Sequence, residues 1–309
     1  MVQKESQMKF FYLAHGIVSY VCLKDLLAKD CTPAFVVTHK DYEYDKLKDA
    51  FYIPMKALCE KYSVPLYGVE KISGLNNEIA KCEVGICLGF MEIIKKETLD
   101  LPEHGIMNIH GGKLPKYRGR APITRSIMNG EKFFTLTMHK MDEGVDSGDV
   151  CLETAIPITD KDDLSSLYIK CAAESAPLVE RFFQAVERET LTCRKQDLSL
   201  NPKPYRKITD EERRINWNNT SRTLFNLVRA LVPPFPGAFF IYKDKQYLAL
   251  KANILLDNNV GSPGEILFVE DKALIVKCAE GSLEIVSIAD ENLNPVTIID
   301  TFEKGEILV

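Results

Sequence analysis

The chain has few of the features that mark membrane, secreted or nucleic-acid-binding proteins. No apolar stretch approaches membrane-spanning length, and the apolar run near the start is broken by His15 and Gly16. The nine cysteines include no C-x-x-C pair and no metal-ligand spacing, so we expect reduced thiols and a cytoplasmic location. The net charge of −5 lacks the basic field that nucleic-acid binders usually show. A membrane partner is therefore excluded, and nucleic acid is disfavoured.

The first half of the chain alternates short β-rich runs with helical patterns. The runs that predict strands are KFFYLAHG, PAFVVTH, PLYGV and VGICLGF, and those that predict helices are VCLKDLLAKD and AFYIPMKALCEKYSV. This alternation predicts an α/β domain with a doubly wound parallel sheet and helices on both faces. Ligands of such sheets bind beyond the carboxyl ends of the strands, so the loops after FYLA, ICLGF and IMNIH are expected to carry the chemistry.

The second half changes character twice. The run DDLSSLYIKCAAESAPLVERFFQAVE has helical spacing and predicts a long helix, whereas TLTCRKQDLSLNPKPYRKITDEE has no periodicity and is typical of a linker. We place a boundary there, with one domain over 1–202 and another over 203–309. After a helix at SRTLFNLVRAL, the second domain contains the short runs GAFFIY, QYLALKANILL, GEILFV, ALIVKC and LEIVSI. These predict a small antiparallel barrel.

Two segments bring together residues suited to acyl transfer. NIHGGKLPKYRGRAP places Asn108 and His110 at the end of a predicted strand, although a lone His there is more often structural than catalytic. MDEGVDSGDV places Asp146 in an acidic loop, where a solvated turn is the simplest alternative. A calcium loop is excluded because the D-x-D-x-D-G spacing with its terminal Glu is absent. An Asn, a His and an Asp can supply an amide donor, a base and an orienting carboxylate.

These motifs resemble the folate-dependent formyltransferase family, in which an Asn, a His and an Asp form the active site. The resemblance rests on Asn108-x-His110, on LPKYRGRAP and on DEGVDSGD, and GFMEII is similar to the family's loop around the pterin. RINW, RALVPPFPGAFF and the stretch from VVTHKDYEYDKLKD to KYSVPLY are similar to the branch that formylates amino sugars on nucleotide carriers. The resemblance covers nearly the whole chain and implies a Rossmann-like catalytic domain followed by an OB-like barrel. One departure is Gly-Lys-Leu-Pro where many members have Ser-Leu-Leu-Pro.

The resemblance implies 10-formyltetrahydrofolate as formyl donor, with no metal. Asn108 is expected to hold the developing oxyanion, and His110 to accept a proton from the attacking amine. Asp146 is expected to orient the imidazole and to help carry the proton to the departing folate nitrogen. The residues implied for the pterin, mainly through their backbone, are Phe90, Met91, Glu92, Ile94, Asp142, Glu143 and Gly144. The residues implied for the substrate are Lys113, Arg118 and Gly119. Of these, we expect the Lys113 side chain to point into water and not to contact the substrate.

The expected acceptor is the primary amine of a nucleotide-linked amino sugar. From Lys207 to the end the chain has 15 Asp and Glu against 11 Lys and Arg, a net charge of −4, which suits a tRNA clamp poorly. The aromatic residues of PPFPGAFF are expected to be buried beside a rigid turn in preference to stacking on bases. Methionyl-tRNA formyltransferase, a formyl hydrolase and a binding protein on the same fold stay open as alternatives, and a homo-oligomer is compatible with the sequence.

Overall fold

The computed structural model describes residues 8–39, 55–201, 203–233, 235–256 and 260–309. Their contacts form two compact units. The first unit contains Met1–Pro122, Phe133–Pro157 and Tyr168–Tyr205, and the second contains Ile123–Lys132, Ile158–Leu167 and Arg206–Val309. The functional division into 1–202 and 203–309 stays a prediction. Among the described residues, no helix is both long and apolar enough to cross a bilayer.

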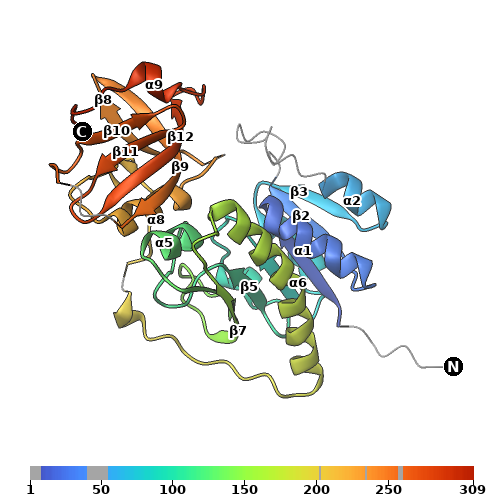
Figure 1. The fold of residues 1–309 in the computed structure, drawn as a ribbon. Helices are drawn as coiled ribbons and strands as arrows, with labels where there is room; N and C mark the ends of the chain where they lie inside the picture. Colours follow the sequence, from blue (N-terminus) through green and yellow to red (C-terminus); the bar gives the residue numbers. More distant parts are fainter. Residues whose placement is uncertain (1–7, 40–54, 202, 234, 257–259) are drawn as a thin grey trace. The chain divides into compact units, whose positions relative to one another are not determined.

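The first unit is built on a seven-stranded sheet of order β3-β2-β1-β4-β5-β6-β7 (Figure 1). Five strands are parallel: β1 (Phe10–Ala14), β2 (Val36–His39), β3 (Leu66–Val69), β4 (Val84–Leu88) and β5 (Ile106–His110). Two more are antiparallel to their neighbours: β6 (Phe133–Lys140) and β7 (Val150–Pro157). The predicted doubly wound sheet is confirmed, but its β5 edge is extended by an antiparallel pair that the sequence reasoning did not predict.

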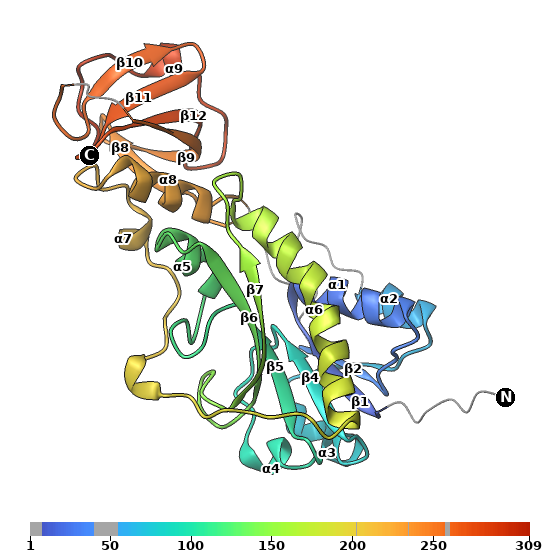
Figure 2. The same ribbon diagram turned by 60° about the horizontal axis from the view of Figure 1, so that its bottom comes forward.

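Helices cover both faces of this sheet. Their bounds are α1 (Gly16–Ala28), α2 (Met55–Lys61), η3 (Ile72–Leu75), α3 (Asn76–Ile79), α4 (Lys96–Leu99), α6 (Leu164–Glu187) and η4 (Leu198–Leu200). The helix α5 (Pro122–Met128) lies almost entirely in the second unit. The long predicted helix is confirmed as α6, which lies beside α1 in both views (Figures 1 and 2). Lys29, at the end of α1, pairs with Glu180 of α6 at 2.5 Å. Residues 40–54, part of the segment used for the resemblance, lie outside the described residues.

The predicted linker is not a free connector over residues 190–201 and 203–205, which we call the strap. Val150 and Arg194 exchange backbone hydrogen bonds of 2.9 and 2.8 Å, and the amide of Tyr205 donates to the carbonyl of Arg118 at 2.8 Å. The side chain of Asn201 donates to the carbonyl of Lys116 at 3.0 Å. Periodicity is absent because the strap is held by polar contacts along its length and has no amphipathic face.

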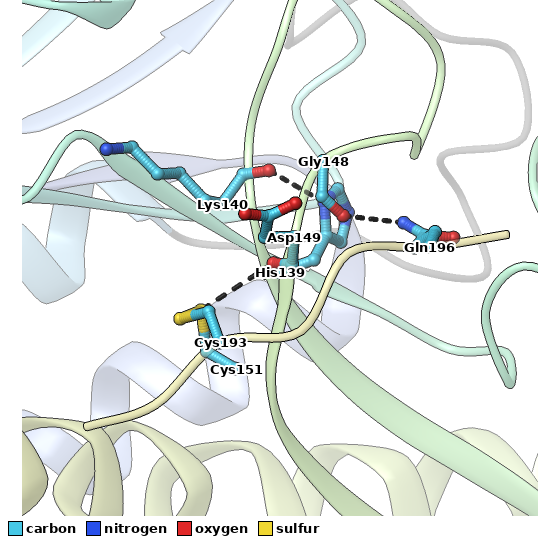
Figure 3. The surroundings of a disulfide bond; sticks show 7 residues. All are labelled: His139, Lys140, Gly148, Asp149, Cys151, Cys193 and Gln196. Atoms are coloured by element: carbon cyan, nitrogen blue, oxygen red, sulfur yellow. Dashed lines mark hydrogen bonds between the residues drawn. A yellow bond between two sulfur atoms is a disulfide. The ribbon is translucent and has the colours of Figure 1, made fainter. Parts of the chain in front are cut away.

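The expectation of nine reduced thiols is also wrong. Cys151 of β7 and Cys193 of the strap form a disulfide, while the other seven cysteines are free and buried (Figure 3). The two cysteines adjoin Val150 and Arg194, which form an antiparallel bridge. The next pair outward stands at a non-hydrogen-bonded position, where side chains face each other closely. A separation of 42 residues leaves no local motif, and the thiol argument for a cytoplasmic location loses its premise.

The second unit is a small barrel, as predicted. Its elements are α7 (Asp210–Arg213), α8 (Ser221–Ala230), β8 (Ala238–Tyr242), β9 (Lys245–Leu255), β10 (Ile266–Glu270), β11 (Ala273–Lys277), β12 (Ser282–Asp290) and α9 (Ile298–Thr301). The antiparallel sheet has the order β10-β11-β12-β9-β8. Residues 305–309 bridge its edges: the amide of Gly305 donates to Ile266 at 2.8 Å, and that of Val309 donates to Ile241 at 3.0 Å. Phe239 and Phe240 are buried, as expected for the PPFPGAFF aromatics, whereas Phe235 is only half-buried.

Candidate active site

The structure brings Asn108, His110 and Asp146 into contact. Asn108 and His110 are two apart on β5, so both side chains lie on the same face of the strand. Asp146 lies in the loop between β6 and β7. Its Oδ2 atom is 3.5 Å from Nδ1 of His110, and its Oδ1 atom is 3.4 Å from Nδ2 of Asn108. The predicted set of amide, imidazole and carboxylate therefore exists as one cluster.

Asp146 is fixed by backbone contacts from another loop. Its backbone has a φ of +48°, which non-glycine residues rarely adopt. Oδ2 accepts a hydrogen bond of 2.9 Å from the amide of Gly119, whose own φ is +94°. Burial raises the pKa of Asp146, but His110, His139 and the Gly119 amide outweigh burial and hold the pKa well below its ordinary value. Asp146 is therefore a carboxylate at any pH near neutrality.

His110 has two ring nitrogens with different partners. Nε2 lies 2.7 Å from the carbonyl oxygen of Tyr117, and because a carbonyl only accepts, Nε2 carries the proton. Burial lowers the pKa of His110, and the opposing charge of Asp146 does not reverse this. Nδ1 is thus an unprotonated acceptor at neutral pH, and it faces Asp146. An imidazolium formed by protonation of Nδ1 would be stabilised by that carboxylate.

His139 also belongs to the cluster, and the sequence reasoning missed it. It lies on β6 directly opposite Asn108 in the antiparallel register. Nε2 of His139 is 3.0 Å from Nδ2 of Asn108, and Nδ1 is 3.2 Å from the carbonyl of Lys140. The carbonyl of Lys140 assigns the proton of the neutral ring to Nδ1, so that Nε2 accepts from the Asn108 amide. Nε2 also lies 3.5 Å from Oδ1 of Asp146, to which it donates when His139 is protonated. The alternating run FFTLTMHK could have indicated the strand, but the pairing opposite Asn108 required the fold.

The predicted pterin loop after β4 packs partly into the core. Phe90 is buried and its ring stacks on that of His39, with centroids 4.1 Å apart. The amide of Met91 donates to Nε2 of His39 at 3.2 Å. Ile94 lies in a buried cluster, against which Met141, at the start of the second predicted pterin loop, also packs. Both predicted pterin segments therefore border the same hydrophobic cluster.

The polar side chains of these segments have local partners. Glu92 accepts from the amide of Ile72 at 3.0 Å, and Asp142 accepts from the amide of Gly144 at 3.0 Å. Glu143 and Gly144 are exposed. Apolar side chains on both segments are exposed as well, among them Met91 and Val145 at 61 and 40 %. Exposed apolar groups beside backbone donors and acceptors suit a flat heteroaromatic ring such as a pterin.

The three residues expected to contact the acceptor differ in their surroundings. Lys113 is exposed, which agrees with the expectation that its side chain points into water. Arg118 is 6 % exposed, and its guanidinium donates to the carbonyls of Val145 at 2.9 Å and Asn201 at 3.0 Å. This geometry does not by itself support a substrate contact for Arg118, because the guanidinium already donates to backbone carbonyls of two other segments. The amide of Gly119 is used by Asp146. Among the described residues, no cluster of His, Cys, Asp and Glu is suited to a metal.

Comparison with known families and relatives agrees with this geometry. Residues 22–181 match the family described as Formyl transferase, and residues 207–305 match its C-terminal domain. The methionyl-tRNA formyltransferase of Thermodesulfovibrio yellowstonii is 32% identical over 280 residues, which are 89% of each chain. The bifunctional polymyxin resistance protein ArnA of Wigglesworthia glossinidia brevipalpis is 30% identical over 91% of this chain, but the match covers only 42% of that protein.

Solved structures show the same fold at low sequence identity. An N-formyltransferase from Helicobacter canadensis, in complex with folinic acid and dTDP-3-aminofucose, has a TM-score of 0.69 at 18% identity, covering 90% of this chain and 98% of that one. WlaRD, a sugar 3N-formyl transferase, has a TM-score of 0.66 at 19% identity, covering 91 and 97%. With both domain matches and relatives of this identity, the chain belongs to the formyl transferase family and is a folate-dependent N-formyltransferase.

Proposed function

We propose that this enzyme transfers the formyl group of 10-formyltetrahydrofolate to the primary amine of a nucleotide-linked amino sugar. The observation that carries the choice of acceptor is the charge of the second unit. Beyond its acidic balance, several of its cations are paired internally: Arg213 with Asp210 at 2.5 Å, Arg222 with Asp160 at 2.6 Å and Lys243 with Glu303 at 2.6 Å. Cations held in this way are poorly placed to neutralise the phosphates of an RNA.

A fourth cation of the second unit is withdrawn from the surface. Arg229 is 8 % exposed and donates to the carbonyls of Thr159 at 2.6 Å and Asp162 at 3.0 Å. The burial of Phe239 and Phe240 removes these two rings as a stacking surface for bases. A small acceptor that needs one pocket and a few polar contacts fits this unit better than a long polyanion does.

The proton chemistry follows from His110. When the acceptor amine attacks the formyl carbon, the new C–N bond makes the amine acidic, and Nδ1 of His110 takes one of its protons. The resulting imidazolium faces the Asp146 carboxylate 3.5 Å away. As the C–N bond to the folate breaks, Nδ1 returns the proton to the departing N10 nitrogen. The formyl group, the electron pair and the proton are then all accounted for, and His110 is neutral again.

The charge that develops on the formyl oxygen requires a donor, and Asn108 supplies it. One hydrogen of its Nδ2 group is directed to Nε2 of His139 at 3.0 Å. The other faces Asp146 at 3.4 Å, which is long for a hydrogen bond, so this hydrogen is the one available to the oxyanion. His139 therefore fixes the amide while leaving one donor for the reaction.

Folate is expected to bind where the two predicted pterin segments border the cluster of Phe90 and Ile94. Main-chain groups of Glu92, Ile94, Asp142 and Gly144 would recognise the pterin, since the side chains of Glu92 and Asp142 are occupied locally. The donor's N10 would then lie toward the Asn108 cluster.

Formylation of methionyl-tRNA is the second candidate. It is favoured by the relatives of that name, which are 32% identical over 89 and 92% of this chain. The same catalytic cluster would serve both acceptors, because each presents a primary amine. The difference lies in what binds the rest of the acceptor.

A panel experiment tests the proposal. The enzyme is incubated with 10-formyltetrahydrofolate and UDP- or dTDP-linked 3-amino and 4-amino sugars, and mass spectrometry seeks the addition of one formyl group. A parallel arm contains methionyl-tRNA, and a third contains no acceptor, which would reveal hydrolysis of the donor. Formylation of at least one sugar nucleotide, lost in His110→Ala, is expected. Formylation of methionyl-tRNA alone, or hydrolysis alone, would contradict the proposal.

A further inference from the structure

We infer that the strap positions the catalytic loop through Gln196, and that the Cys151–Cys193 disulfide makes this positioning sensitive to dithiol reductants. The inference rests on the catalytic role proposed for Asp146. It concerns residues that contact neither the acceptor nor the donor in the scheme above. Figure 3 shows Gln196 pointing from the strap toward Gly148.

Gln196 restrains the catalytic loop at Asp146 itself and at Gly148, two residues further along the chain. Its Nε2 atom donates to the carbonyl of Asp146 at 3.0 Å and to the carbonyl of Gly148 at 2.6 Å. Both partners can only accept, so the amide nitrogen must be the atom that faces them. Both hydrogens of this group are used, and Oε1 is buried without a hydrogen-bond partner. Burial of Oε1 without a partner costs free energy, and the two hydrogen bonds to the loop offset that cost.

The loop needs such a restraint because Asp146 is held in a left-handed conformation, with a φ of +48°. A residue of this kind persists when its surroundings fix it, and it would otherwise relax. Relaxation would move the carboxylate away from the amide of Gly119 and from His110, which it contacts at 2.9 and 3.5 Å. A displacement of about 1 Å in a catalytic group can cost roughly a hundredfold in rate.

The disulfide anchors the strap three residues before Gln196. Cys193 is exposed, and a hollow of about 360 Å³ is lined by both cysteines and their strand neighbours, so a small dithiol can reach the bond. A dithiol would give two electrons and two protons to the S–S bond, leaving two thiols, and would itself become a disulfide. The strap would then keep its hydrogen bonds, among them the two between Val150 and Arg194, together with the Arg194–Glu153 pair at 3.0 Å, but it would lose its covalent link to β7. We expect it to loosen without leaving the sheet.

The test compares the oxidised enzyme, the enzyme reduced with dithiothreitol, the Cys151→Ser/Cys193→Ser double variant and Gln196→Ala. Alkylation followed by peptide mass spectrometry establishes that the labels are on Cys151 and Cys193. We expect reduction to lower kcat between about threefold and a hundredfold, with the KM for the folate donor little changed. The double variant should match the reduced enzyme and should not respond to dithiothreitol.

Gln196→Ala should lower kcat even when the disulfide is oxidised. Reduction of this variant should then lower kcat by a smaller factor than in the unchanged enzyme, because both changes act on one contact. Lys195→Ala, an exposed neighbour on the strap, is the matched control and should behave like the unchanged enzyme. Gln196→Glu should not restore the rate, because a carboxylate cannot donate to two carbonyls. Thermal unfolding of each variant verifies that it is folded.

A second readout separates this inference from the choice of acceptor. Hydrogen exchange of a peptide covering residues 142–149 should become faster on reduction and in Gln196→Ala, whichever acceptor the enzyme uses. If no sugar nucleotide is formylated, this readout still decides the inference. An enzyme with both thiols labelled that keeps the oxidised kcat and the oxidised exchange of this peptide would overturn it.

Discussion

At the scale of single residues, the two ring nitrogens of His110 have different roles in the proposed reaction. The Tyr117 carbonyl fixes the proton on Nε2 and thereby orients the ring, which is the task that the sequence reasoning had assigned to Asp146. Asp146 faces the other nitrogen and is ready to pair with a proton received there. In the proposed reaction the carboxylate therefore stabilises the imidazolium.

Replacing His110 tests the proton-acceptor role. His110→Ala should lower turnover by roughly a hundredfold to ten-thousandfold, the usual contribution of a general base, while folate affinity and thermal stability change little. Steady-state kinetics and folate titration check this result. His104→Ala, at a histidine in the loop before β5, is the control and should retain full turnover. A near-normal rate in His110→Ala would remove His110 from the mechanism.

The pH dependence of the reaction should report the same group. Only neutral His110 can accept a proton, and burial lowers its pKa from the model-peptide value of 6.5, so kcat/KM should rise with pH along a limb centred below 6.5. Asp146 cannot be the source of this limb, because its pKa lies well below its ordinary value and it stays ionised.

Asp146→Asn should separate these two groups further. The Asp146 charge raises the His110 pKa, so its loss should move the acidic limb to lower pH, while kcat falls more than donor affinity. A pH–rate profile of the variant tests the direction. A limb that moves to higher pH, or a variant that loses only donor affinity, would contradict the role given to Asp146.

Residues at strand ends were predictable, and residues defined by strand pairing were not. Asn108 and His110 share one short run with their strand, so their face and their position at the sheet edge follow from spacing alone. His139 and Gln196 act through partners 31 and 50 residues away, Asn108 and Asp146, and no local pattern reveals such pairs. Arg118 stays a predicted substrate residue, and its burial with bonds to two backbone carbonyls could not have been inferred from a cation beside a motif.

At the scale of elements, the loop over residues 111–121 supplies one donor at a position that only glycine tolerates. Gly119 has a φ of +94°, and a Cβ there would lie 2.4 Å from the carbonyl oxygen of Tyr205. Its amide must stay in place because it donates to Asp146. A bridge between Gly119 and Tyr205 ties this loop to the strap, whose path no helical or strand periodicity could have predicted.

Gly119→Ala should therefore lower both stability and activity. The free energy of unfolding should fall by about 1 kcal/mol or more, because alanine does not tolerate this backbone conformation, and kcat should fall as the donor to Asp146 shifts. Chemical denaturation and steady-state kinetics measure the two effects. Gly74→Ala is the matched control, since that glycine has open space around its Cβ position and no positive φ. Equal behaviour of the two variants would show that the Gly119 loop adapts freely.

At the scale of the whole molecule, the alternation of strands and helices predicted the first architecture, and the series of short strand runs predicted the second. It did not predict the antiparallel β6–β7 extension, nor the closure of the barrel by residues 305–309, because backbone pairing at an edge leaves no side-chain pattern. The sequence did contain the acidic balance of the second unit, and the structure adds the ion pairs that occupy Arg213, Arg222 and Lys243. Charge is thus the property that most clearly distinguishes the candidate acceptors.

The dependence of acceptor binding on salt concentration distinguishes a sugar nucleotide from a tRNA. A sugar nucleotide should be held in a pocket with a few contacts to its diphosphate, so raising NaCl from 50 to 200 mM should lower its affinity only modestly. A tRNA held by about six to ten phosphate contacts would lose roughly a thousandfold or more in affinity over the same range. We expect neither binding nor formylation of methionyl-tRNA at ordinary ionic strength, and formylation of a 3-amino or 4-amino sugar nucleotide under the same conditions. Salt titrations of binding, with formylation followed in parallel, make the comparison. Efficient formylation of methionyl-tRNA with a steep loss of binding as salt rises would replace the acceptor, yet it would leave the roles of Asn108, His110 and Asp146 intact, because these residues act on the amine and the formyl group common to both reactions.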